Sequence, residues 1–273
     1  MEIYSLSFFL LVSVGLILYY TVFSRCQWIC LLGLSLLFFT ASGWKGLVFL
    51  LFTALTIWLG GLQLAKLDAD SAARRKAPGI TKDEKKVIKA QAVRRKKCLV
   101  AAVLTANFLV LGYFKYWSYF AELLSGAFSA TAPSSLGLVM PLGISFYTFQ
   151  ALSYVIDLYR GEIKVQKNWF LLALYISFFP QLVAGPIVRY TDVEAQLRSR
   201  TVTVQGFSFG VKRFLYGLAK KVILANCFAA KADEVFALDP AGVGTALEWL
   251  GALYYGLQIY YDFSGYSDRK SVV

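Results

Sequence analysis

One apolar stretch, residues 168–189, restricts the fold more than any other part of the chain. The run from Trp169 to Leu182 is apolar enough for a membrane helix, but it is short. A bilayer core is about 30 Å thick and requires about 20 helical residues. The 13 residues from Trp169 to Gln181 make only about 20 Å of helix. The run ends in Phe-Pro-Gln, and Val-Ala-Gly-Pro follows. Because irregular backbone at membrane depth is tolerated only where protein or a water-filled cavity surrounds it, we expect a re-entrant segment that enters the membrane, breaks and lines an interior site.

The composition indicates an integral membrane protein. Of the 273 residues, 58% are hydrophobic and 16% are charged, whereas soluble domains carry about 25% charged residues. Several apolar runs approach 20 residues, so we predict an all-α, polytopic membrane protein with re-entrant and interfacial helices. A net charge of +12 would suggest nucleic acid as the partner of a soluble protein. Here the positive-inside rule accounts for it, and the bilayer is the expected partner.

A basic segment, residues 66–97, sets the expected orientation. It holds twelve Lys or Arg and four Asp or Glu, a net charge of +8. Short connections of this kind stay in the cytoplasm. Because three expected spans precede this segment, the N-terminus would lie outside. Full crossing by residues 169–182 would put the later cations Arg189 to Arg213 outside, so charge also favours re-entrance. Thr81 and Glu84 have the spacing of a capping box, which predicts a helix start inside this basic loop.

The ionisable residues give no recognisable catalytic or metal site. The chain has four cysteines and no histidine, so it lacks the commonest general base and the commonest metal ligand. Cys26 and Cys30 could share a helix face, but no third or fourth ligand lies nearby in the sequence, and we expect no metal. We also find no nucleophile–base pair by spacing.

A few polar residues in apolar surroundings remain as candidates. Asp262 lies near the end of the apolar segment 246–263. A carboxylate at such a position faces a polar cavity, a cationic partner, or a structural hydrogen bond. Gly265 would let backbone approach closely. Arg189 either meets an anionic group or is an ordinary positive-inside arginine. We expect Asp157 at the membrane interface near Arg160.

Three motifs resemble a known family. PLGISFYTFQALSYVIDLYRG, FFPQLVAGPIVRY and YYDFSGYSD are similar to the membrane-bound O-acyltransferases, in particular their bacterial alginate and exopolysaccharide O-acetylases. GLAKKVILANCFAAKADEVFAL also resembles that branch. The similarity covers residues 1–268, which would form one incomplete membrane domain of this type, and we expect residues 269–273 to be an artefactual tail.

The resemblance implies a multi-helix enzyme with a central tunnel. An acetyl group would pass from a cytoplasmic donor, such as acetyl-CoA, to periplasmic or extracellular partner proteins and then to a polysaccharide such as alginate. No bound cofactor is implied, and the expected location is the bacterial inner membrane. The residues expected to line the tunnel or its mouths are Gln181, Gly185, Pro186, Arg189, Asp262 and Tyr266.

The chain departs from the family pattern in one respect. The catalytic histidine of the family lies beyond YYDFSGYSD, and this chain has none. We therefore assign no catalytic residue and expect residues 1–273 alone to be inactive. Three alternatives remain: a transporter or channel subunit, since broken helices are common there, a D-alanyl transferase of the same family, and a scaffold that only recruits partners.

Overall fold

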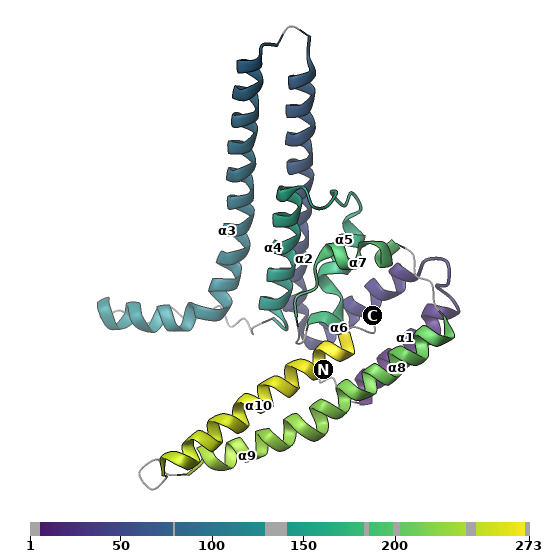
Figure 1. Cartoon of the computed structure of the whole chain (residues 1–273), viewed down its shortest axis with the longest axis vertical. Coiled ribbons are helices and arrows are strands. Elements are labelled where there is room, and N and C mark those ends of the chain that lie inside the picture. Colours follow the sequence, from purple (N-terminus) through teal and green to yellow (C-terminus); the bar gives the residue numbers. More distant parts are fainter. Residues whose placement is uncertain are drawn as a thin grey trace. The chain divides into compact units, whose positions relative to one another are not determined.

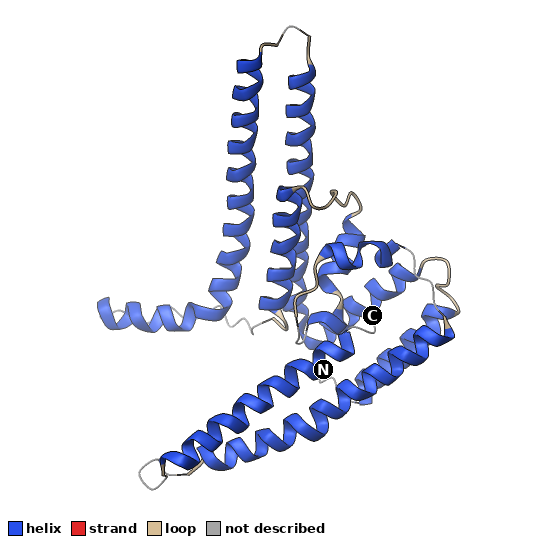
Figure 2. Cartoon of the chain, viewed as in Figure 1, coloured by secondary structure: helices blue, strands red, loops and turns tan. Residues whose placement is uncertain are grey.

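The computed structural model describes residues 6–78, 80–128, 141–182, 186–198, 203–238 and 244–270. Within these ranges every regular element is helical (Figure 2). The chain divides into two compact units, one of Met1–Leu182 with Ile187–Ser199 and one of Val183–Pro186 with Arg200–Val273. The prediction of an all-α fold is confirmed.

The first unit is organised around its second helix. Its helices are α1 (Leu6–Tyr20), α2 (Gln27–Lys76), α3 (Lys82–Phe128), α4 (Ile144–Arg160), α5 (Trp169–Ser177), α6 (Phe179–Leu182) and α7 (Tyr190–Arg198). Helix α2 packs against α1, α3, α4 and α5, and α2 and α3 run side by side in Figure 1. Gly43 interrupts α2 with a φ of +142°, a conformation that favours glycine. Residues 44–76 then form one helix about 50 Å long.

Two described helices are long and apolar enough to cross a membrane. They are Gln27–Lys76 and Lys82–Trp117, whereas the apolar stretch Trp169–Gln181 is shorter and is divided between α5 and α6. Helix α4, residues Ile144–Arg160, ends at Gly161, whose φ is +80°. There Glu162 N donates to Asp157 O and Gly161 N to Leu158 O, which is the Schellman pattern. Together the helices are those of an all-α membrane protein.

The basic segment 66–97 is helical rather than a loop. Helix α2 continues to Lys76 and α3 begins at Lys82, so the described connection is short. The predicted capping box is present: Thr81 N donates to Glu84 Oε2 (2.8 Å), and Glu84 N donates to Thr81 Oγ1 (3.3 Å). The hydrogen bond from the Thr81 backbone N–H stabilises the ionised Glu84 carboxylate and so lowers its pKa. The helix start predicted inside the basic connection is therefore confirmed, and Lys, Arg, Glu and Ala all favour helix along it.

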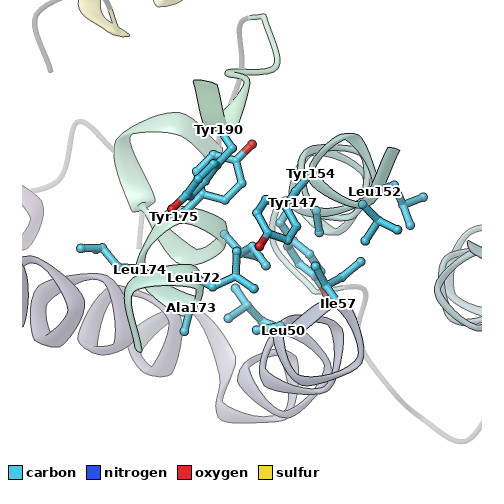
Figure 3. Packing of buried hydrophobic residues seen from close by; sticks show 14 of the residues in the cluster. Leu50, Ile57, Tyr147, Leu152, Tyr154, Leu172, Ala173, Leu174, Tyr175 and Tyr190 are labelled. Carbon is cyan, nitrogen blue, oxygen red and sulfur yellow. The ribbon is translucent and has the colours of Figure 1, made fainter. Parts of the chain in front are cut away.

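The hydrophobic core of the first unit lies where α2, α3, α4 and α5 meet. Figure 3 shows Leu50 and Ile57 of α2 beside Tyr147 and Tyr154 of α4 and Leu172 of α5. All five are fully buried. Helix α5 is thus enclosed by protein, with the residues from Leu172 to Ser177 buried on every side.

The second unit is a helical hairpin. One arm consists of α8 (Val204–Ala219), the π-helical turn η1 (Lys220–Ala225) and α9 (Asn226–Phe236), which follow one another without a break. The other arm, α10 (Thr245–Lys270), packs against all three. Figure 1 shows α10 in yellow returning beside the green arm. The Thr203 hydroxyl caps α8 by accepting from Gly206 N (3.0 Å).

Gly265 allows the two arms to approach closely. A Cβ at this position would lie 2.7 Å from the backbone oxygen of Gly217 and 3.4 Å from Lys221 N. Backbone atoms of a neighbouring helix cannot move aside as a flexible side chain can. The expectation of close backbone approach at Gly265 is confirmed.

We predict that Gly265→Ala destabilises the hairpin relative to a matched change. Alanine gains about 1 kcal/mol of helix propensity over glycine, but overpacking against a backbone oxygen costs about 1–3 kcal/mol. Gly256→Ala is the control, because it lies on the same helix with no atom within 4 Å of the new Cβ. Thermal unfolding in detergent should give a higher Tm for Gly256→Ala than for Gly265→Ala. Equal Tm values for the two variants would contradict the close approach.

Candidate functional site

The short apolar helix breaks as predicted, but earlier than expected. Helix α5 ends at Ser177, Phe178 is extended (φ −61°, ψ 101°), and α6 is a single turn from Phe179 to Leu182. Pro180 has no N–H to donate to the Ile176 carbonyl and its ring would clash there, so α5 cannot continue through it. The structure describes no membrane, and re-entrance of residues 168–189 stays a prediction.

A buried glutamine on α4 binds both sides of this break. Gln150 Nε2 donates to the Tyr175 carbonyl (2.8 Å) and to Gln181 Oε1 (3.2 Å). The Tyr175 hydroxyl in turn donates to the Val188 carbonyl (2.8 Å), beyond the break. Gln150 is 2% exposed and Gln181 is 6% exposed. The end of α5, the turn α6 and the segment after it are therefore all fixed relative to α4.

Two further tyrosines extend this arrangement. Tyr154 accepts a hydrogen bond from Gln166 N (2.8 Å), and Gln166 Nε2 donates to the Tyr190 hydroxyl (2.9 Å). The Tyr190 ring lies edge-on to Tyr154 and Tyr175, at centroid distances of 5.0 and 5.2 Å, and Figure 3 shows the three rings together. We call this set the buried polar network; its members are Gln150, Tyr154, Gln166, Tyr175, Gln181 and Tyr190.

Three buried oxygens beside the network have no hydrogen-bond partner within the described ranges. They are Asp157 Oδ2, the Tyr147 hydroxyl and the Ser177 hydroxyl. Asp157 is 3% exposed, and Arg160 lies near Glu162 instead (3.9 Å). Asp157 is thus buried inside the protein and does not pair with Arg160, while its depth at the membrane interface stays a prediction. Unpaired buried oxygens keep the capacity to hydrogen-bond a water or another small polar group.

Of the tunnel residues expected in the first part of the chain, the structure buries one. Gln181 belongs to the buried polar network. Pro186 and Arg189 are exposed, and Gly185 lies outside the described residues. The structure brings Gln181 together with Gln150 and Tyr175, which composition alone did not single out as its partners.

The other two expected residues, Asp262 and Tyr266, lie one turn apart on α10 in the second unit. Asp262 Oδ1 is 2.9 Å from Lys221 Nζ, and these side chains are 34% and 19% exposed. The cationic partner is therefore the alternative that the structure supports for Asp262. Gln181 and Asp262 belong to different units of the chain.

The pairing of Asp262 is part of a larger ionic seam in the hairpin. Asp268 lies 2.6 Å from Lys220 Nζ and 3.6 Å from Arg213 Nε. Lys220 also donates to the Ser264 hydroxyl (3.0 Å). The seam consists of Arg213, Lys220, Lys221, Asp262 and Asp268. In the sequence, these cations recur at helical spacing, but nothing local shows which acids they meet.

Comparison with known proteins identifies the relatives of the chain. No protein-family model matches it. A probable alginate O-acetylase, AlgI, of Pseudomonas aeruginosa is 37% identical over 266 residues, 95% of this chain. The chain is a homologue of the alginate O-acetylases. The resemblance to this branch of the membrane-bound O-acyltransferases is confirmed.

Two other relatives of this chain are named for the transfer of other acyl groups or to other acceptors. A peptidoglycan O-acetyltransferase of Helicobacter pylori is 33% identical over 193 residues, 60% of the chain and 36% of the relative. A teichoic acid D-alanyltransferase of Streptococcus thermophilus is 31% identical over 133 residues, 46% of the chain and 32% of the relative. The chain covers 46% of the P. aeruginosa protein, so it spans about half the length of that relative.

We predict an energetic coupling between the two glutamines of the network. Gln150→Leu leaves the buried Tyr175 carbonyl without its donor, which costs about 1–3 kcal/mol. The double variant Gln150→Leu/Gln181→Leu should lose less than the sum of the single losses, by about 0.5–2 kcal/mol, because the two side chains share one hydrogen bond. The free energy of unfolding in detergent measures both.

Gln258→Leu provides the matched control, since Gln258 is half-buried on α10 and no hydrogen bond to it is among those of the described residues. Additive losses for the Gln150 and Gln181 variants, or an equal loss for Gln258→Leu, would contradict the network.

Proposed function

We propose that this chain forms membrane helices of an O-acetyltransferase that passes acetyl groups across the bacterial inner membrane. The donor would be acetyl-CoA or a similar cytoplasmic molecule. The acetyl group would reach an extracellular polysaccharide such as alginate through acetyl-transfer partner proteins outside. The similarity to the alginate O-acetylases along 95% of the chain supports this reaction class.

The broken helix α5–α6 is the observation that carries the proposal. A helix that ends inside the bilayer leaves room for a polar path, provided that its free backbone groups are bonded within the protein. Gln150 supplies that bonding at Tyr175 and Gln181. The free oxygens of Asp157, Tyr147 and Ser177 would then face a polar group in the path.

The residues assigned here bind and position rather than react. Acyl transfer to a hydroxyl requires a base for the hydroxyl proton and donors for the developing oxyanion. The side chains of the buried polar network are amides and phenols, Asp157 beside it is a carboxylate, and the chain has no histidine. Their role in our proposal is to hold the break open and orient the polar groups along it.

Re-entrance predicts that the segments on both sides of 168–189 face the cytoplasm. In a background without native cysteines, single cysteines at Lys164 and Ala195 should both react with an impermeant maleimide in inside-out vesicles and not in intact cells. Both positions are exposed. A cysteine at Ser134, expected outside, is the control and should show the reverse. Labelling of Lys164 and Ala195 from opposite sides would show a full crossing.

A chimera tests the reaction itself. Residues 1–268 of this chain would replace the matching part of the P. aeruginosa alginate O-acetylase, in a strain lacking its own copy. We expect the chimera to restore O-acetyl groups to alginate, measured by NMR of the purified polymer. A chimera that inserts at the parental level but gives alginate without acetyl groups would contradict the proposal. Incorporation of labelled D-alanine by such a chimera would instead favour the D-alanyl alternative.

A further inference from the structure

The basic arms of α2 and α3 are longer than membrane insertion requires. Residues 44–76 of α2 make about 50 Å of helix, against a hydrocarbon core of about 30 Å. On α3, Lys89 lies ten residues and Lys86 thirteen residues before the apolar run that begins at Leu99, or about 15 and 20 Å along the axis. Both helices are continuous along these arms (Figure 1).

Lipid headgroups do not account for the far end of these arms. The headgroup layer adds about 5–8 Å on each side of the core, and charges beyond a Debye length of about 8 Å are largely screened. Arg94 and Lys97 are close enough to Leu99 to meet headgroups. For a helix along the membrane normal, Lys89 at about 15 Å lies beyond the headgroup layer, and Lys86 at about 20 Å also lies more than a Debye length past it.

One face of α3 carries these charges around an apolar centre. Side chains at positions 86, 89, 90, 93, 94 and 97 surround one shallow, open hollow on the surface. We call this set the α3 stripe; it consists of Lys86, Lys89, Ala90, Val93, Arg94 and Lys97. All six are exposed, and their spacing places them along one side of the helix.

A different face of α3 packs on α2. There Lys96 Nζ lies 2.6 Å from Asp68 Oδ1 of α2, and its side chain is 14% exposed. Ala92 and Ile88 lie one and two turns before Lys96, and both are less exposed than the stripe. In the stripe, Lys86 lies near Asp83 (3.3 Å), while Lys89, Arg94 and Lys97 have no ion pair with a described residue. The stripe is thus free of the intramolecular packing of the arm.

We propose that the α3 stripe is a docking surface for an acidic amphipathic helix of a soluble protein. Lys86 and Lys89, beside the apolar Ala90 and Val93, match a helix whose apolar residues lie between acidic ones. Arg94 and Lys97 lie at the headgroup end of the stripe. A polyanion without apolar groups would leave the centre of the stripe uncovered. A surface of about three turns of one helix is small, so the contact is transient and its association is electrostatically steered.

A binding experiment with a designed peptide tests this. The probe is a fluorescent helical peptide with a leucine stripe flanked by glutamates, and the comparison peptide has the same composition in scrambled order. The full chain is placed in nanodiscs of neutral phosphatidylcholine, and anisotropy gives Kd. Lys86→Glu/Lys89→Glu should weaken binding at least about tenfold, whereas the off-stripe pair Lys85→Glu/Arg95→Glu, with the same charge change, should weaken it less than about threefold.

Two outcomes would overturn the proposal. Equal losses for the two charge variants, or equal affinity for the scrambled peptide, would mean general attraction to a basic arm. Displacement of the peptide in nanodiscs that contain phosphatidylglycerol would mean that the stripe binds anionic lipid. Since the assay requires no acetyl transfer, its failure would leave the proposed function untouched.

Discussion

The hydrogen bonds of Gln150 are the interaction on which the first unit depends. A helix that stops inside a bilayer exposes carbonyl and N–H groups that water cannot reach, and each costs several kcal/mol if unpaired. One amide from α4 serves both the Tyr175 carbonyl and Gln181, on the two sides of Phe178. Because Gln150 is itself held in a helix packed on α2, the break is as fixed as the core around it.

In the hairpin of the second unit, oppositely charged side chains meet between the two arms. Its ionic seam lies between the two arms, while large apolar side chains such as Tyr216 and Ile223 are exposed by 70% and 60%. This arrangement is the reverse of a soluble hairpin, in which the apolar side chains would face inward. It is expected where the surroundings are apolar and charges find partners within the protein. Gly265 permits the close approach that keeps the paired groups within reach.

The sequence predicts the features that depend on near neighbours. The capping box at Thr81 and Glu84 and the break next to Pro180 rest on residues within one or two turns, and both are present. The partners of Gln181 and Asp262 lie 31 and 41 positions away along the chain. No local pattern ranks one distant glutamine or lysine above another. The first pair emerges only from the packing of α4 on α5 and α6 in the first unit, and the second from the packing of α10 on η1 in the second unit.

Helix α3 connects the basic arm to the buried core without a joint. Its α3 stripe ends at Lys97, and Val100, Val103 and Leu111 of the same helix are buried in the core cluster. Gly60 of α2 lies so close to Val103 that a Cβ there would be 2.8 Å from the valine side chain. Between Lys82 and Leu111 the helix has no proline, and Gly112 follows this stretch, so no sharp kink is expected within it. A protein bound at the stripe would therefore be held at a fixed distance from the core helices that support the broken helix, which favours a role in presenting a molecule to the membrane over a role as a hinge.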